Sequence, residues 1–460
     1  MDYETFLENK RIKDPATGIS GTIELPEFLF SHQRDITRWA LRRGRAAIFA
    51  GTGLGKTLME LVWSHKVSLF TGKPVLLLAP LAVSHQHLGE AGRFGISAQV
   101  VSARGEQAID ISNYQKLDHF DLSDFGGVAL DESSILKNVD GHYRTRLIAE
   151  CACIPFRLAA TATPAPNDFM ELGNHAEFLG VMRYTDMLAT FFVHDGGDTR
   201  KWRLKGHAED EFWRWMASWA VMLRKPSDLG YSDDGYNLPP LRYHNHVVQA
   251  DYRPSFETGF LFPMPARSLS ERLAVRRESI EDRVRLAASL TPADRPFVWW
   301  CNLNSEAEQL ARAIPGAVNL SGSDSDGEKE RKLKAFSDGR IKDLITKPSI
   351  AGFGMNWQHC CDTGFVGMND SWEQIYQAIR RFWRFGQTKP VNAHFISDER
   401  EGNVVQNFRR KDADAERMAE AMVRHMADLS SEAVRGLSRD VPDYQPEQPM
   451  TIPNWIGEAA

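Results

Sequence analysis

The segment Ala50–Thr57, AGTGLGKT, constrains this chain more than any other. It follows the apolar run 46–49 and leads into a helix-like segment at 57–62, which predicts a strand that turns through a glycine-rich loop into a helix. Its glycines let the backbone bend tightly and point N–H groups at oxygen anions, and the following helix N-terminus adds partial positive charge. Lys56 can reach terminal phosphates and Thr57 can bind Mg²⁺. We therefore predict that the phosphates of ATP or GTP bind to Gly51, Thr52, Gly53, Leu54, Gly55, Lys56 and Thr57.

The length and charge of the chain limit the remaining possibilities. With 460 residues it exceeds what a single hydrophobic core fills, so two domains are expected. The net charge of −6 provides no general attraction to nucleic acid, and any such contact must come from local basic clusters. No signal peptide and no apolar stretch of membrane-spanning length is evident, so we expect a cytoplasmic protein, in a bacterium or in the host of a phage, with no membrane partner.

The five cysteines favour reduced thiols over a disulfide framework, because their number is odd and their spacing bunched. Cys151 and Cys153, or the run His359-Cys360-Cys361, can be imagined as zinc ligands. Neither group has the gap usual between zinc ligands, and buried thiols of a cytoplasmic protein are the favoured interpretation.

The first half of the chain alternates short apolar runs with segments of helical spacing. Strands are predicted at 46–50, 75–79, 98–102, 128–131 and 156–160, with helices such as 58–70 and 85–94 between them. This alternation is typical of a parallel sheet covered by helices, whose ligands bind at the carboxyl ends of the strands. The glycine-rich loop, Asp131-Glu132 and Thr161–Thr163 all fall there.

Residues 167–225 are predicted to form a helical, aromatic-rich insertion. Its aromatic residues favour core packing over a base-stacking surface. Residues 226–240 are rich in Gly, Asp, Ser and Pro and predict a loop that ends the first domain at residue 240.

A second alternating series predicts another α/β domain at 241–440, without a phosphate loop of its own. Helical periodicity extends over 403–436, and four prolines predict an irregular tail at 441–460. Strands are expected at 243–248, 296–301, 317–320, 343–346, 363–367 and 391–396, and helices at 269–290, 305–313, 327–337 and 372–385.

Two further groups complete the chemistry of a nucleotide hydrolase. Asp131 ends an apolar strand, where it can bind Mg²⁺ directly or through water, and Glu132 can orient or deprotonate the attacking water. Arg381 and Arg384 are three residues apart, so a helix would place both on one face. Their guanidinium groups suit the charge that builds on a transferring phosphoryl group, while a basic face that contacts DNA or carboxylates is the alternative.

In order along residues 26–398, these motifs resemble those of the superfamily 2 helicases and, among them, the SNF2-like DNA translocases. Phe30–Gln33 is similar to the Q motif, whose glutamine reads adenine, which implies that role for Gln33. The loop at 50–57 resembles motif I, where Ala in first position is common. Leu78–Leu81, with Glu90 downstream, resembles motif Ia, although the family often has Trp where His87 stands.

The resemblance continues through the remaining motifs. The stretch 111–114 is similar to the segment before motif II, and Asp131-Glu132-Ser133-Ser134 resembles motif II without its usual third and fourth residues. Residues 160–164 resemble motif III, 352–357 motif V, and 377–387, with its Arg-Phe-Gly-Gln ending, the SNF2 form of motif VI.

The resemblance implies a fold and further site residues. It implies two tandem RecA-like α/β domains, each a mainly parallel sheet flanked by helices, with ATP and Mg²⁺ in the cleft between them. It implies a nucleotide contact at Gly354, with coupling through Thr161, Thr163 and Gln377. A nucleic acid across both domains would contact Pro80, Asn113 and Asn356.

Three functions fit these features. The first is a DNA-stimulated ATPase that translocates on duplex DNA, with replication, recombination or repair proteins as partners. The second is a strand-separating helicase on DNA or RNA, for which a hairpin in 193–205 could serve as the splitting element. The third is a nucleotide-gated DNA-binding scaffold without turnover, which the intact catalytic residues disfavour.

Overall fold

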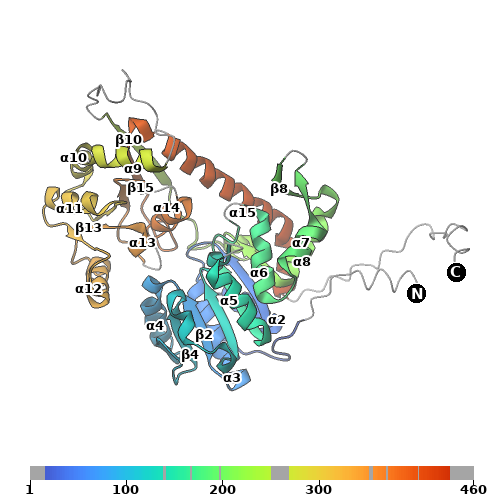
Figure 1. The fold of residues 1–460 in the computed structure, drawn as a ribbon. Helices are drawn as coiled ribbons and strands as arrows, with labels where there is room; N and C mark the ends of the chain where they lie inside the picture. Colours follow the sequence, from blue (N-terminus) through green and yellow to red (C-terminus); the bar gives the residue numbers. More distant parts are fainter. Residues whose placement is uncertain are drawn as a thin grey trace, which may run out of the picture.

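The chain forms two α/β domains (Figure 1). The computed structural model describes residues 16–137, 141–165, 168–195, 198–249, 269–351, 356–368, 371–401 and 403–435. Each domain is built on a sheet in which all paired neighbours run parallel, and helices flank both sheets. The predicted fold class, two tandem RecA-like domains with mainly parallel sheets, is confirmed.

The sheet of the first domain has seven strands in the order β3-β4-β2-β5-β6-β1-β9. Alternate residues of a strand face opposite sides, and here both sides are buried: Ala47 and Phe49 join one apolar cluster, Ile48 and Ala50 another. A strand that is buried on both faces is a continuous run of apolar residues in the sequence. The strands are β1 (Arg45–Ala50), β2 (Val75–Ala79), β3 (Ala98–Val100), β4 (Ile109–Asn113), β5 (Gly127–Asp131), β6 (Phe156–Thr161) and β9 (Ala220–Leu223).

Two of these strands were not predicted. β4 alternates polar and apolar residues although it is buried, and its Asp110 is held by the main-chain N–H of Gly105 at 2.8 Å. β9 follows directly on a helix inside the predicted insertion, with no turn residues to mark its start. The helices of this domain are α2 (Ser31–Arg43), α3 (Lys56–Thr71), α4 (Ser84–Arg93), α5 (His142–Glu150), α6 (Leu172–Leu179), α7 (Tyr184–Phe191) and α8 (Glu209–Trp219).

The insertion is helical but also contains a hairpin. Strands β7 (Phe192–Asp195) and β8 (Asp198–Leu204) pair antiparallel and overlap the range 193–205 that was considered for a hairpin. The aromatic side chains of α8, among them Trp213 and Trp219, are buried in the domain core, as expected for packing residues. The segment predicted as a helical insertion thus also contains a hairpin, and its last strand, β9, belongs to the main sheet.

The sheet of the second domain has six strands in the order β10-β15-β14-β11-β13-β12. Trp300 and Phe297 on β11 face opposite sides and enter two separate apolar clusters. The strands are β10 (Leu241–Val248), β11 (Phe297–Trp300), β12 (Val318–Asn319), β13 (Asp343–Thr346), β14 (Asp362–Phe365) and β15 (Val391–Asp398). The helices are α9 (Leu269–Glu278), α10 (Ile280–Leu290), α11 (Asn304–Ala313), α12 (Asp326–Ser337), α13 (Pro348–Ala351), α14 (Trp372–Ile379) and α15 (Asn403–Arg435).

The long helix α15 joins the two domains. Its first part packs on the second domain through Val404, Val405 and Phe408. Its later part returns to the first domain, where Met422 and Met426 are buried in the core (Figure 1). Among the described residues no helix, α15 included, has the length and apolarity needed to cross a membrane.

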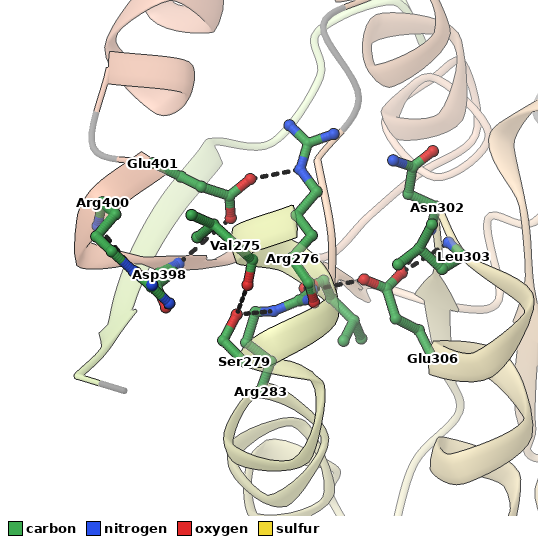
Figure 2. A network of polar contacts seen from close by, with 11 residues as sticks. Val275, Arg276, Ser279, Arg283, Asn302, Leu303, Glu306, Asp398, Arg400 and Glu401 are labelled. Carbon is green, nitrogen blue, oxygen red and sulfur yellow. Dashed lines mark hydrogen bonds and ion pairs between the residues drawn. The ribbon is translucent and has the colours of Figure 1, made fainter. Parts of the chain in front are cut away.

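Two fully buried arginines tie α9 and α10 to the rest of the second domain (Figure 2). Arg283 donates to Glu306 at 2.6 Å and to the main-chain oxygen of Val366, while Arg276 pairs with Glu401. Buried charges persist only when paired in this way. Val366 lies just after β14, and Glu401 lies just before α15. The network therefore fixes the chain before the segment that carries Arg381 and Arg384, and again before the long helix α15.

Candidate nucleotide site between the two domains

The glycine-rich loop connects β1 to α3 as predicted. Gly53 and Gly55 have φ of 89° and 81°, values that favour glycine. A Cβ at Gly53 would lie 2.7 Å from the main-chain nitrogen of Phe385, so the second domain rests directly on the loop. The Lys56 ammonium donates to the main-chain oxygens of Ala50 at 2.8 Å and Gly51 at 3.4 Å, which holds it across the loop.

Asp131 is the last residue of β5 and Glu132 follows it, and both line the same pocket as Lys56. Burial raises the pKa of both carboxyl groups, to about 6 for Asp131 and about 7 for Glu132, and the Lys56 ammonium opposes both shifts. Burial lowers the pKa of Lys56, and these two carboxylates oppose that shift. Glu132 has φ of 57°, a left-handed conformation rare for a side chain of its size and typical of functional sites.

Thr161 and Gln377 both donate to Oε1 of Glu132. The Thr161 hydroxyl lies 3.3 Å from that oxygen, and the Gln377 amide, from the second domain, lies 2.8 Å from it. The main-chain N–H of Thr163 donates to the Thr161 hydroxyl at 3.1 Å. The three residues predicted to couple the site to the rest of the protein thus form one chain of contacts through Glu132.

The segment that carries Arg381 and Arg384 differs from its prediction. α14 ends at Ile379 and turns follow, so the two arginines are not on one helix face as expected from 372–385. Both nevertheless line the same pocket as Lys56. The Arg381 guanidinium donates to the Gln377 side chain at 3.1 Å, whereas the buried Nε of Arg384 has no hydrogen-bond partner among the described residues.

These groups enclose a small cavity, the phosphate pocket, with a volume of about 80 Å³. A cavity that holds a small-molecule ligand is typically about 300–1,000 Å³. The phosphate pocket by itself is therefore smaller than the space that a whole nucleotide occupies. The lining includes Thr52, Gly53, Gly55, Lys56, Thr57, Asp131, Glu132, Gln377, Arg381 and Arg384.

The donor set of this pocket fits Mg²⁺. The Thr57 hydroxyl and the Asp131 carboxylate both line it, and both are the hard oxygen ligands that Mg²⁺ prefers. The lining formed by the described residues contains no cysteine and no histidine.

Gln33 lies beside the loop but its amide is already engaged. Its Oε1 accepts from the Phe30 N–H at 3.1 Å and its Nε2 donates to the Leu54 carbonyl at 3.1 Å. Aromatic rings from both domains gather here, with Phe385 centred 4.6 Å from Tyr236 and 6.2 Å from Phe30. Sequence reasoning missed Tyr236 and Phe385, although Phe385 falls within the Arg-Phe-Gly-Gln run.

A much larger space, the interdomain groove, lies beside the phosphate pocket, with a volume of about 1060 Å³. Pro80 and Asn356, two of the predicted nucleic-acid contacts, line it from opposite domains. Asn113 does not: its side chain is buried at the end of β4, and its Oδ1 has no partner among the described residues. Gly354 lies outside the described residues.

One ion pair and one hydrogen bond cross the groove between the domains. Glu373 on α14 pairs with Lys137 and accepts from the Ser134 hydroxyl at 2.8 Å. All three residues also line the groove. Sequence reasoning missed Lys137 and Glu373, because residues more than two hundred positions apart give no local signal of contact.

A third cluster adjoins Asp131 and was not predicted as a site. Nε2 of His87 on α4 lies 3.4 Å from Glu60 Oε2 and 3.4 Å from Asp131 Oδ2. Burial of the ring opposes its protonation, but the two carboxylates outweigh this and raise the pKa of His87 to about 9. The sequence contained one sign of this cluster: His87 stands at a position where the family that the chain resembles often has Trp.

No protein-family model and no curated protein matches this sequence. Among solved structures, the chain is similar to the SWI2/SNF2 ATPase core of Sulfolobus solfataricus in complex with double-stranded DNA. The two sequences are 16% identical, the match covers 90% of this chain and 98% of that chain, and the TM-score is 0.42.

Proposed function

We propose that the protein is a nucleic-acid-dependent ATPase, an SNF2-like motor that translocates on double-stranded DNA. One observation carries the proposal: Lys56 and Glu132 of the first domain line a single pocket with Arg381 and Arg384 of the second. A phosphate-binding loop, two carboxylates and two guanidinium groups are the parts that phosphoryl transfer from a nucleotide requires. Because these parts come from two domains, the site is complete only when the domains close.

The residues divide the chemistry among them. Lys56 and the loop N–H groups bind the phosphates, and Mg²⁺, which Thr57 and Asp131 would hold, offsets their negative charge. Glu132 orients the attacking water and accepts its proton. Arg381 and Arg384 stabilise the charge that develops on the transferred group. Gln377 of the second domain contacts Glu132 of the first. Loss of the γ-phosphate beside Glu132 would therefore alter this interdomain contact directly.

The interdomain groove is the proposed track for the nucleic acid. Pro80 and Asn356 line it, and contacts there would be mainly to phosphates, which carry no sequence information. A groove walled by both domains changes shape whenever the domains move, so opening and closing of the nucleotide site can advance the strand.

A strand-separating helicase is the second candidate, and the hairpin β7–β8 favours it. β8 and the residue after it carry Arg200, Lys201, Arg203 and Lys205 beside Trp202, a composition suited to nucleic acid. An unwinding assay on forked and blunt duplexes decides between the two: separation of the forked strands would favour the helicase.

The proposal is tested by the rate of ATP hydrolysis with duplex DNA, single-stranded DNA, RNA and no nucleic acid. We expect the largest stimulation with duplex DNA, and no turnover in Lys56→Ala, whose circular dichroism should match the wild type. The matched control is Lys66→Ala, which removes the same side chain from the same helix away from the pocket. Near-normal hydrolysis by Lys56→Ala would refute the mechanism.

A further inference from the structure

A further cavity between the domains, the chamber, has no role in the mechanism above. Its volume is about 630 Å³, within the range of about 300–1,000 Å³ that is typical of sites for small molecules. Its lining comes from the first domain at Met222, from the second at Arg380, and from the long helix α15 at Met418 and Met422. A molecule in the chamber would therefore touch both domains and the helix that joins them.

The chamber adjoins the phosphate pocket without containing its chemistry. Thr52 and Ala162 line both spaces. Lys56 and Glu132, in contrast, line the phosphate pocket but not the chamber. A ligand of the chamber would thus not meet the groups that are proposed to act on phosphate.

Aromatic rings and thioethers form much of the chamber wall. The Trp383 indole is fixed by donation to the Pro239 carbonyl at 2.6 Å, and the ring of Trp372 lies 4.9 Å from that of Tyr376. The methionines of β9 and α15 line the chamber beside these rings. Because aromatic rings pack favourably against one another and against methionine sulfur, these walls favour a flat aromatic ligand.

Arg380 brings a positive charge without an ionic partner to this wall. Its Cζ lies 4.6 Å from the centre of the Tyr376 ring and 4.3 Å from that of Trp383. Such stacking uses the flat faces of a guanidinium group and leaves the N–H donors around its edge available. Among the described residues, none forms an ion pair or a hydrogen bond with these donors. A carboxylate matches this edge and brings one negative charge, whereas a phosphate group brings up to about two into the same apolar space.

The carboxylates in the chamber lining are already engaged elsewhere. Glu416 and Glu420 pair with Arg224. Asp228 accepts from two main-chain N–H groups, and Asp412 accepts from a tyrosine hydroxyl and an indole N–H. None of them is placed to form an ion pair with the stacked guanidinium, so a ligand can supply that partner.

We propose that the chamber is a binding site for a small aromatic carboxylate, whose carboxylate pairs with Arg380 and whose rings pack against Trp372, Trp383 and the methionines. This site goes beyond the proposed ATPase activity and does not depend on it. Because its occupant contacts both domains, binding opposes their separation.

The test compares two probes of the same shape on the nucleotide-free protein, the aromatic carboxylate naphthoate and its uncharged amide, naphthamide. Calorimetry should give a Kd of about 1 mM or lower for naphthoate and binding about tenfold weaker or less for naphthamide. Arg380→Gln should bind naphthoate no better than naphthamide, and Arg380→Lys, which keeps the charge but loses the planar fork, should lie between it and wild type. Arg312→Gln, at an exposed position of α11 outside the chamber lining, is the matched control and should bind naphthoate like the wild type.

A second variant tests the place of binding. Ala419 on α15 lines the chamber, so Ala419→Trp should fill it and abolish naphthoate binding while circular dichroism stays that of the wild type. Saturating naphthoate should also slow hydrogen exchange over residues 418–424 in wild type and not in Arg380→Gln. If Ala419→Trp does not fold, the exchange comparison locates the site.

Three results would overturn the inference. Naphthoate and naphthamide could bind wild type equally, or Arg380→Gln could bind naphthoate as wild type does. Alternatively, ADP or inorganic phosphate could displace naphthoate, which would make the chamber part of the nucleotide site. Since binding is measured without nucleotide, a wild-type protein without ATP turnover would refute the proposed function and leave the chamber site standing.

Discussion

Arg381 and Arg384 lie three residues apart but have different surroundings. We infer from this difference that they have different roles. Arg381 contacts Gln377, which in turn contacts Glu132, so its removal would disturb the interdomain contact as well as the charge. Arg384 has a buried Nε without a partner among the described residues, and burial lowers its pKa to about 10. An arginine that is still charged at neutral pH and whose Nε lacks a partner there is suited to donate hydrogen bonds to the phosphate of a ligand.

We expect Arg384→Ala to lower kcat by about 10³-fold or more while nucleotide binding weakens only slightly, because the guanidinium acts on charge that develops during the reaction. Single-turnover hydrolysis and ADP titration measure the two effects separately. Arg380→Ala is the matched control, since Arg380 stacks 4.3 Å from the Trp383 ring outside the phosphate pocket. Equal losses of kcat in both variants would remove Arg384 from this role.

Glu132 connects activity with stability through its raised pKa. The native pKa of about 7 exceeds the ordinary value of 4.5, so the native state binds the proton more tightly than the unfolded chain does. The contribution of Glu132 to stability is therefore full below pH 4.5 and is lost as pH rises to about 7. As a base it behaves in the opposite way, because only the ionised form accepts a proton.

We expect turnover to rise with pH through about 7 and then to level off. Glu132→Gln should abolish turnover and raise the unfolding temperature at pH 8, where the wild type carries the buried charge. Rate–pH profiles and thermal unfolding at pH 5 and pH 8 provide the measurements. A lower unfolding temperature for Glu132→Gln at pH 8 would contradict the assignment.

At the scale of elements, α15 is one continuous helix of 33 residues, about 50 Å long, with its two ends in different cores. Near its middle, Arg224 of the first domain pairs with Glu416 and Glu420. Any relative motion of the domains must bend this helix or release one of its ends. The contacts of its later part with the first domain thus oppose separation of the domains.

Met426→Ala should destabilise the protein by about 2–5 kcal/mol, because Met426 is fully buried. Hydrogen exchange should quicken over residues 418–434, which pack on the first domain, more than over 404–412 on the second. Met418→Ala, at a half-buried position on the same helix, is the milder control. Uniform exchange along the whole helix would show that α15 does not release at one end.

Local patterns predicted the elements of this fold better than they predicted contacts between them. The apolar runs of β1, β2 and β5 are evident in the sequence, whereas β4 and β9 lack the composition or the turn residues that mark a strand. The helix predicted over 372–385 stops at Ile379, because tertiary contacts such as that of Trp383 with the Pro239 carbonyl outweigh helical periodicity. The Gly-rich loop and Asp131-Glu132 carry local motifs, but the Gln377–Glu132 contact and the Glu60–His87 pair depend on the folded arrangement alone.

At the scale of the whole molecule, the two domains meet on both sides of the phosphate pocket. Phe385 rests on Gly53 at one side, and Glu373 pairs with Lys137 at the other. The cavity between these contacts has a volume of about 80 Å³. Both contacts hold the domains together in this arrangement, so we expect the domains to separate before a nucleotide binds.

The consequence is kinetic: capture of ATP should be limited by a gate rather than by diffusion. In stopped-flow mixing with a fluorescent ATP analogue, the observed binding rate should rise with concentration and then reach a plateau set by domain opening. Glu373→Ala, which removes the Lys137 ion pair, should raise that plateau. Glu399→Ala, at an exposed position outside the groove lining, should leave it unchanged. A rate that increases linearly up to millimolar nucleotide would mean that the pocket is open most of the time in solution.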